Sequence, residues 1–298
     1  MSIRLNMLEK IKNSQGFIAA LDQSGGSSPK ALEQYGISSS EISSDEEMFK
    51  YIHSMRARII SSSPFNSQKI LGAILFKDTL NRYIENIPTA EYLWKHKEIV
   101  PFLKIDEGLM PESDGVQLMK PIKNLGSILT VDTNFVFGTK MRSVIKQASR
   151  IGIQNVVKQQ FEIAKEVINS GLMPIIEPEV DIYCEEKQSA ELMLHDVIIE
   201  ELNNLEDGQQ VILKLTLPEV PNLYKDLATH PKVLKLVALS GGYSITQANE
   251  KLKRNTGIIA SFSRALLIGL HHDMSDKKFD EKLNNSIEAI YEASIYKL

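Results

Sequence analysis

The stretch Gln210-Val211-Ile212-Leu213-Lys214-Leu215-Thr216-Leu217 is apolar at nearly every position and carries one lysine in its middle. An unbroken run of leucine and β-branched residues predicts a parallel strand that is covered on both faces, and a central ammonium group departs from that pattern. Two interpretations fit the run by itself. Lys214 could end an edge strand and extend its charge to water. Alternatively the lysine is buried, and burial favours the neutral amine, which is a nucleophile towards carbonyl groups.

The composition predicts a cytoplasmic globular protein. The chain has 298 residues, of which 43% are apolar and 24% charged, and its net charge of −4 lacks the basic excess that nucleic-acid binding requires. The single cysteine, Cys184, excludes an intramolecular disulfide and a cysteine-only zinc site, which favours a reducing compartment. We find neither a secretory signal core nor an apolar run of membrane-spanning length. We therefore expect no nucleic-acid partner and no membrane association.

Short apolar runs alternate with helical patterns along the chain. The strand-like runs cover residues 17–22, 70–76, 100–108, 135–142, 172–179, 210–217, 233–239 and 257–264. Helical patterns cover residues 2–14, 45–60, 89–97, 155–169, 188–205, 222–230 and 246–254, the chain ends in helices, and residues 109–134 predict a loop with a short helix near 122–128. Eight strand-helix repeats predict an α/β fold, a closed (β/α)₈ TIM barrel, in preference to an open doubly wound sheet. No linker divides the pattern, so we expect residues 1–298 to form a single domain.

Polar side chains lie where these strand-like runs end. In a barrel, functional groups lie at the carboxyl ends of the strands, and strand residues two positions apart share a face. Taken singly, each polar pair could be a solvated strand end or an ion pair at the rim. Their convergence on one rim predicts a functional site. The residues concerned are Asp22, Lys104, Asp106, Lys140, Arg142, Glu177, Glu179, Lys214, Ser240, Ser261 and Arg264.

The expected rim is slightly positive and has two glycine-rich turns. Five cations stand against four carboxylates, namely Lys104, Lys140, Arg142, Lys214 and Arg264 against Asp22, Asp106, Glu177 and Glu179. The turns Ser24–Gly26 and Ser240–Gly242 precede helical patterns and expose backbone N–H groups that no Cβ obstructs. One such turn is weak evidence. Two of them beside cations predict an anionic ligand with two phosphate groups.

The histidines do not suggest a metal site. None lies at the end of an apolar run or in an H-x-H or H-E-x-x-H spacing. A Ser-His-Asp arrangement and a dinucleotide-binding G-x-G-x-x-G fingerprint are also absent from the sequence. We therefore expect no metal and no cofactor, and we expect a lysine nucleophile that works with acid and base carboxylates.

Six segments carry a family resemblance. They are Ala-Leu-Asp-Gln-Ser-Gly-Gly-Ser (20–27), Phe-Leu-Lys-Ile-Asp (102–106), Gly-Thr-Lys-Met-Arg (138–142), Pro-Ile-Ile-Glu-Pro-Glu (174–179), Leu-Ser-Gly-Gly (239–242) and Ser-Phe-Ser-Arg-Ala-Leu (261–266). The Lys-x-Arg and Glu-Pro-Glu elements, followed by the strand lysine, are highly specific together. The chain resembles class I fructose-1,6-bisphosphate aldolase in its shorter bacterial form. The resemblance implies reversible cleavage of fructose 1,6-bisphosphate to dihydroxyacetone phosphate and glyceraldehyde 3-phosphate.

The resemblance also implies a role for each catalytic residue. Lys214 is similar to the Schiff-base lysine that attacks the ketose C2 carbonyl, and Lys140 would stabilise developing negative charge beside it. Glu177 resembles the acid/base group that forms and dehydrates the carbinolamine, with Glu179 in support. Asp22 would take the proton from the C4 hydroxyl as the C3–C4 bond breaks.

The same resemblance implies the phosphate sites. Ser240, Gly241 and Arg264 match the site of the ketose phosphate, and Ser261 is expected near them. The aldehyde-side phosphate would lie near Lys104, Arg142, Ser24 and Ser27. One departure stands out, because Ala31 replaces an arginine of the animal members, although Lys30 is adjacent.

Three functional readings stay open on the sequence. The first is cleavage of fructose 1,6-bisphosphate. Another Schiff-base barrel aldolase, acting on tagatose 1,6-bisphosphate or a related sugar phosphate, is the second, because stereochemistry at C4 is not legible in one sequence. The third is a non-catalytic phosphate-binding scaffold, which has no need of a buried strand lysine. A homo-oligomer is compatible with the sequence, but no surface identifies its interface.

Overall fold

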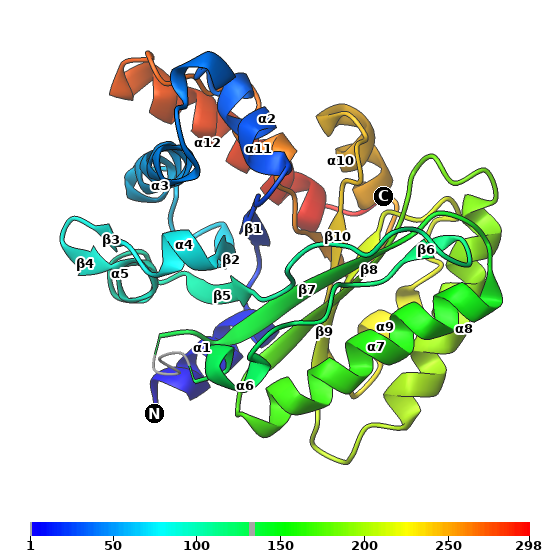
Figure 1. The fold of residues 1–298 in the computed structure, drawn as a ribbon. Helices are drawn as coiled ribbons and strands as arrows, with labels where there is room; N and C mark the ends of the chain where they lie inside the picture. Colours follow the sequence, from blue (N-terminus) through cyan, green and yellow to red (C-terminus); the bar gives the residue numbers. More distant parts are fainter. Residues whose placement is uncertain (1, 131–134) are drawn as a thin grey trace.

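The principal sheet is a nearly closed barrel of eight parallel strands (Figure 1). The computed structural model describes residues 2–130 and 135–298. The ring closes where the Ala20 amide donates to the Phe262 carbonyl, 3.3 Å away, beside the last strand. The predicted (β/α)₈ barrel is confirmed. In order around the ring, the strands are β1 (Phe17–Leu21), β2 (Ile70–Phe76), β5 (Val100–Lys104), β7 (Gly138–Ile145), β8 (Met173–Val180), β9 (Val211–Thr216), β10 (Val233–Leu239) and β11 (Ile258–Ala260).

Helices cover the outside of the strands, and α7 and α8 lie side by side over β7 and β8 (Figure 1). In chain order, the helices are α1 (Ile3–Asn13), α2 (Ser27–Gln34), the 3₁₀ helix η1 (Ser39–Glu41), α3 (Asp45–Ser61), α4 (Lys77–Leu80), α5 (Thr89–Lys97), α6 (Leu125–Ile128), α7 (Arg150–Asn169), α8 (Lys187–Asn203), α9 (Lys225–Thr229), α10 (Ile245–Lys253), α11 (Arg264–Leu267) and α12 (Asp276–Ile295). Within the described ranges, no helix combines the length and the apolarity that crossing a membrane requires.

A side-chain cap explains why one helix starts earlier than predicted. The helix predicted from residue 155 begins at Arg150, because the Ser149 hydroxyl accepts a hydrogen bond from the Gly152 amide at 3.2 Å. The helix predicted over 89–97 matches α5. The residue that caps its C-terminus, Glu98, adopts a left-handed backbone with φ +53°.

The fourth and eighth strands differ most from their predictions. The strand predicted over 135–142 lies too early, because β7 extends to Ile145 and pairs there with the end of β8 and with β6 (Val116–Gln117). β6 and the hairpin of β3 (Tyr83–Ile84) and β4 (Ile87–Pro88) are antiparallel additions that the sequence pattern did not reveal. β11 has only three residues, where the pattern suggested 257–264. Part of the predicted 109–134 loop, residues 131–134, lies outside the described residues.

Apolar side chains fill the barrel towards the amino ends of the strands. The ring of Phe102 lies between two glycines, and a Cβ at Gly72 would come within 2.9 Å of it and a Cβ at Gly138 within 3.0 Å. Met7 and Ile11 of α1 pack on this interior cluster and close that end. The interior cluster is Met7, Ile11, Ile18, Leu71, Ile74, Val100, Phe102, Phe137, Ile175, Ile212, Leu234 and Val237.

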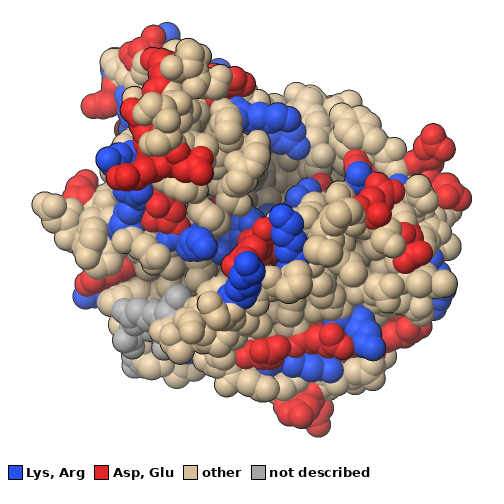
Figure 2. Space-filling model, in the orientation of Figure 1, with Lys and Arg blue, Asp and Glu red and all other residues tan. Residues whose placement is uncertain are grey.

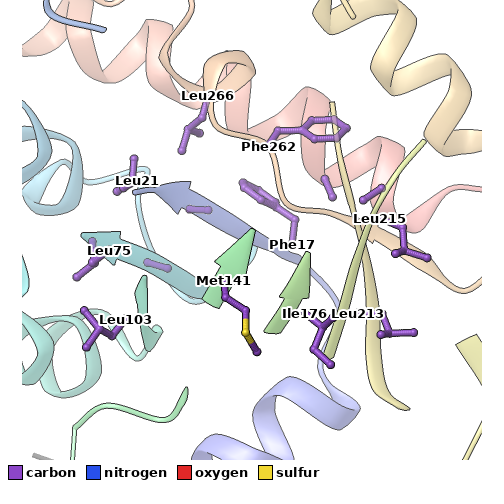
Figure 3. Close-up of a cluster of buried hydrophobic side chains, with 14 of the residues drawn as sticks. Phe17, Leu21, Leu75, Leu103, Met141, Ile176, Leu213, Leu215, Phe262 and Leu266 are labelled. Atoms are coloured by element: carbon purple, nitrogen blue, oxygen red, sulfur yellow. The ribbon is translucent and has the colours of Figure 1, made fainter. Parts of the chain in front are cut away.

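A second apolar layer lies between the strands and the helices. Figure 3 shows Leu213 and Leu215 of β9 in this layer, together with Phe17 of β1 and Ile176 of β8. Side chains alternate between the two faces of a strand, and the Leu213 and Leu215 side chains face outward. Lys214, between them, therefore points into the barrel with Ile212.

Candidate active site

All thirteen predicted site residues line a single cavity of about 560 Å³ at the carboxyl ends of the strands. Figure 2 shows a hollow in the molecular surface with acidic and basic side chains gathered beside it. The predicted residues that line the cavity are Asp22, Ser24, Ser27, Lys104, Lys140, Arg142, Glu177, Glu179, Lys214, Ser240, Gly241, Ser261 and Arg264. The shared face expected from residue spacing therefore exists, while their individual roles stay predictions.

Four charged side chains form a chain of close contacts in the cavity. The Nζ atom of Lys214 lies 3.1 Å from Oε1 of Glu177. The other oxygen of Glu177 lies 2.9 Å from Nζ of Lys140, which in turn lies 2.6 Å from Asp22 Oδ2. The side chains of Lys140 and Lys214 are only 2% and 4% exposed. Lys214 is thus a buried lysine within a charged cluster, and the edge-strand interpretation is wrong.

The side chains of this cluster stay charged although they are buried. Burial by itself would raise the pKa of Asp22 and of Glu177, but the ammonium groups of two lysines outweigh it and hold both pKa values below their usual range. Those lysines are Lys140 and Lys214. Burial would also lower the pKa of Lys140, yet three carboxylates, chiefly Asp22 and Glu177, raise it instead. The Lys140 ammonium and both carboxylates therefore stay ionised at neutral pH.

Further ion pairs lie beside this cluster. Lys104 Nζ contacts Oδ1 of Asp106 at 2.7 Å, and the Arg142 guanidinium donates to Glu179. Burial by itself would lower the pKa of Arg142, but the Glu179 carboxylate outweighs burial and raises that pKa. Arg264 is exposed at the start of α11 and forms no ion pair within residues 2–130 and 135–298. Its charge is therefore the one among the five predicted rim cations that no described carboxylate compensates.

The two Ser-Gly-Gly turns differ in structure. Gly241 has φ +61°, and a Cβ there would come within 2.6 Å of the Ile182 side chain, so the turn after β10 requires glycine. In the turn after β1, the Ser27 hydroxyl accepts from the Ser24 amide at 2.9 Å and donates to the Ser24 carbonyl. Both turns line the cavity. The hydroxyl of Ser261 also lines it and has no hydrogen-bond partner in the described structure.

Sequence reasoning missed several residues at this site, among them Gln23, Ser263 and, behind the cavity wall, Arg56. Gln23 and Ser263 line the cavity and are joined by a 2.6 Å hydrogen bond. Arg56 of α3 lies fully buried behind Gln23. Gln23 and Ser263 could have been suspected, because they lie next to Asp22 and Arg264, but an arginine inside a helical pattern carries no such signal. In the described part of the chain, no three His, Cys, Asp or Glu side chains are grouped as a metal site would need.

Two curated proteins are similar to the chain over almost its whole length. "Fructose-bisphosphate aldolase class 1" of Synechocystis sp. is 55% identical over 289 residues, which cover 97% of this chain and 96% of that protein. The protein of the same name from Clostridium acetobutylicum is 56% identical over 290 residues, which cover 97% of this chain and 98% of that protein. No family model matches the chain.

Solved structures share the barrel at much lower identity. A fructose-bisphosphate aldolase of Plasmodium falciparum, solved with TRAP and a small-molecule inhibitor, has a TM-score of 0.77 at 19% identity, covering 99% of this chain and 96% of that chain. A protein of Corynebacterium glutamicum has a TM-score of 0.56 at 13% identity, covering 97% and 92%. These likenesses are evidence for the fold alone. The near-complete alignments above 50% identity decide the family, and this chain belongs to the class 1 fructose-bisphosphate aldolases.

Proposed function

We propose that this protein reversibly cleaves fructose 1,6-bisphosphate to dihydroxyacetone phosphate and glyceraldehyde 3-phosphate through a Schiff base on Lys214. The observation that carries the proposal is the contact between Lys214 Nζ and Glu177 Oε1, 3.1 Å apart inside the barrel mouth. This contact places an amine beside a group that can take and return protons. The identity of more than half of all residues with curated class 1 aldolases supports the same reading.

Schiff-base formation would use the Lys214–Glu177 pair. Glu177 takes a proton from the Lys214 ammonium, and the neutral amine attacks C2 of the ketose, forming a C–N bond as the carbonyl electron pair moves to oxygen. Glu177 gives its proton to that oxygen, takes a second proton from the nitrogen, and delivers it to the carbinolamine hydroxyl, which leaves as water and gives the iminium. One carboxylate can carry out these proton transfers, because Glu177 Oε1 lies 3.1 Å from Lys214 Nζ, while its other oxygen contacts Lys140 at 2.9 Å.

Carbon–carbon cleavage would use Asp22. Its carboxylate takes the proton of the C4 hydroxyl, the C3–C4 electron pair moves towards the iminium, and glyceraldehyde 3-phosphate leaves. The enamine that remains is protonated at C3 and hydrolysed to dihydroxyacetone phosphate. The lowered pKa of Asp22 keeps this base ionised, and the Lys140 ammonium, 2.6 Å away, stabilises negative charge during transfer.

The two phosphates would occupy different parts of the cavity. Ser240, Gly241 and Ser261, with Arg264, would bind the ketose phosphate, and the uncompensated charge of Arg264 favours an anion there. The other phosphate would lie near Ser24 and Ser27 on the first turn, together with Lys104 and Arg142. Arg142 is paired with Glu179 and would exchange that contact for a phosphate.

Borohydride trapping tests the covalent step. Incubation with dihydroxyacetone phosphate followed by borohydride should leave one triose on Lys214, identified by peptide mapping. Lys214→Met should abolish both trapping and cleavage. Lys235→Met is the matched control, because Lys235 is also a lysine on a barrel strand but donates to the Lys12 carbonyl at the other end. A triose on another lysine, or cleavage by Lys214→Met, would refute the mechanism.

Substrate and metal dependence need separate assays. Cleavage of fructose 1,6-bisphosphate should exceed cleavage of tagatose 1,6-bisphosphate, and the opposite order would favour the alternative aldolase. Activity should survive exhaustive EDTA treatment, because the proposed chemistry uses only side chains. The cytoplasmic location, the single domain over residues 1–298 and the homo-oligomer stay predictions, to be tested by fractionation, limited proteolysis and sedimentation.

A further inference from the structure

Arg56 is a buried arginine, and one nitrogen of its guanidinium donates to the active-site wall. Its side chain is fully buried on α3, and in the described structure no carboxylate lies within ion-pair distance of it. The guanidinium donates to the Thr79 hydroxyl at 2.8 Å and to the Gln23 carbonyl at 2.5 Å. Burial lowers the pKa of Arg56 to about 10, so it remains cationic at neutral pH. An unpaired buried charge costs free energy, which these hydrogen bonds must offset.

The side-chain amide of Gln23 connects Arg56 to Ser263 across the cavity mouth. Its side-chain oxygen lies 3.3 Å from Arg56, and its Nε2 donates to the Ser263 hydroxyl at 2.6 Å. In the chain, Gln23 lies between Asp22 and the first Ser-Gly-Gly turn, and Ser263 lies directly before Arg264. One side-chain hydrogen bond thus connects a segment of one proposed phosphate site to a segment of the other.

The connection lies at the weakest seam of the barrel. Each of the other neighbouring strand pairs is registered by a ladder of at least two residue pairs. Between β1 and the segment after β11, the described backbone contact is the single bond from Ala20 to Phe262. The spacing of the two segments at the mouth therefore depends on side chains, and Gln23 and Ser263 supply the contact.

We infer that Arg56, Gln23 and Ser263 are positioning residues that set the distance between the two phosphate sites. The inference rests on the proposed function and deepens it, because it concerns recognition of a substrate with a phosphate at each end. Loss of the Gln23–Ser263 bond should weaken binding of the bisphosphate, which must reach both sites. It should leave Schiff-base chemistry intact, because Lys214 and Glu177 lie on other strands.

A double-mutant cycle tests the coupling. Gln23→Ala and Ser263→Ala should each raise KM for fructose 1,6-bisphosphate by about 3- to 10-fold, the factor for one hydrogen bond, with kcat within about twofold of wild type. The double variant should resemble either single variant, because both lose the same bond. Ser263→Thr keeps the hydroxyl and should restore KM. The inference would be overturned if the KM increases of the two single variants multiplied in the double variant, or if KM were unchanged in both single variants.

Two controls separate positioning from general damage. Gln210→Ala removes a glutamine that donates to the Pro231 carbonyl at 2.8 Å before β9, and it should leave KM unchanged. Arg56 lies in the core, so its replacement would test stability and positioning together, whereas the Gln23–Ser263 cycle tests positioning. A rise in KM for Gln210→Ala equal to that for Gln23→Ala would overturn the inference.

Trapping distinguishes the two proposals. Wild type and Gln23→Ala should both be labelled on Lys214 by saturating dihydroxyacetone phosphate and borohydride, since this ligand has one phosphate. If wild type is not labelled, the proposed function fails. If both proteins are labelled and the KM values agree, only the positioning inference fails.

Discussion

The two ends of the barrel hold lysines in opposite ways. At the base, burial lowers the pKa of Lys235, and its ammonium donates to the Lys12 carbonyl of α1 beside the interior cluster. At the mouth, Lys140 is more deeply buried, yet neighbouring carboxylates raise its pKa. Burial alone therefore does not decide the charge state of a strand lysine. What distinguishes the mouth is the concentration of compensating carboxylates within about 3 Å of the amines, close enough for proton transfer.

Of the changes that leave Lys214 in place, removing the central cation of the mouth has the largest expected effect. Lys140→Met leaves Asp22 and Glu177 buried without their shared partner, which should cost about 3–5 kcal/mol of the free energy of unfolding. Cleavage should fall by about 10²–10⁴-fold, since acid/base groups lose their charge environment. Denaturant unfolding and steady-state kinetics measure the two effects. Wild-type activity in this variant would remove Lys140 from the mechanism, and Lys235→Met is the control at the base.

A cavity at the base should affect stability without changing chemistry. Ile11→Ala removes a fully buried side chain from the interior cluster and should destabilise the protein by about 2–5 kcal/mol. The folded enzyme should keep its kcat and KM, because the interior cluster lies at the opposite end of the barrel from Lys214. Kinetics below the unfolding temperature, normalised to the folded fraction, provide the measurement. A changed KM would show that the two ends are coupled.

Arg264 should contribute to ligand binding more than to folding. Arg264→Ala removes an exposed cation from the mouth and should weaken binding of dihydroxyacetone phosphate by about 1.5–3 kcal/mol, as expected for a charge-assisted contact. Arg254→Ala, at the end of α10 and outside the cavity, is the matched control. Titration calorimetry measures both. Equal affinities of wild type and Arg264→Ala would move the ketose phosphate elsewhere.

The smallest effect is a shift of acid sensitivity. The folded-state pKa values of Asp22 and Glu177 lie below their usual 3.8 and 4.5, so their stabilising contribution is present above those values and is lost as pH falls through the folded-state pKa. In Lys140→Met, burial is opposed by fewer cations and both pKa values rise. Acid unfolding should then begin at higher pH than in wild type, whereas Ile11→Ala should keep the wild-type pH dependence. Parallel pH profiles for all three proteins would contradict this account.

Much of the site could be predicted from the sequence, because the alternation of side chains along a strand is a local property. Side chains alternate with a period of two, so the positions of Lys104, Lys140 and Glu177 at the ends of apolar runs placed them on one face before any contact was known. The eight repeats likewise predicted the barrel. Strand lengths were less predictable, because β7 is extended by pairing with β6 and β8, which depends on partners distant in sequence.

The sequence by itself determined the barrel and the charged residues at the carboxyl ends of its strands, since both follow from apolar periodicity, whereas the residues of the phosphate sites came from glycine-rich turns and from the family resemblance. Only the tertiary structure decided which charges are paired. It joined Arg142 to Glu179 and placed Lys140 between Asp22 and Glu177, and it left Arg264 without a described carboxylate. It also brought Gln23 within 2.6 Å of Ser263, 240 residues away. Such pairings depend on closure of the ring, which brings the first and last strands together, and no local pattern records that distance.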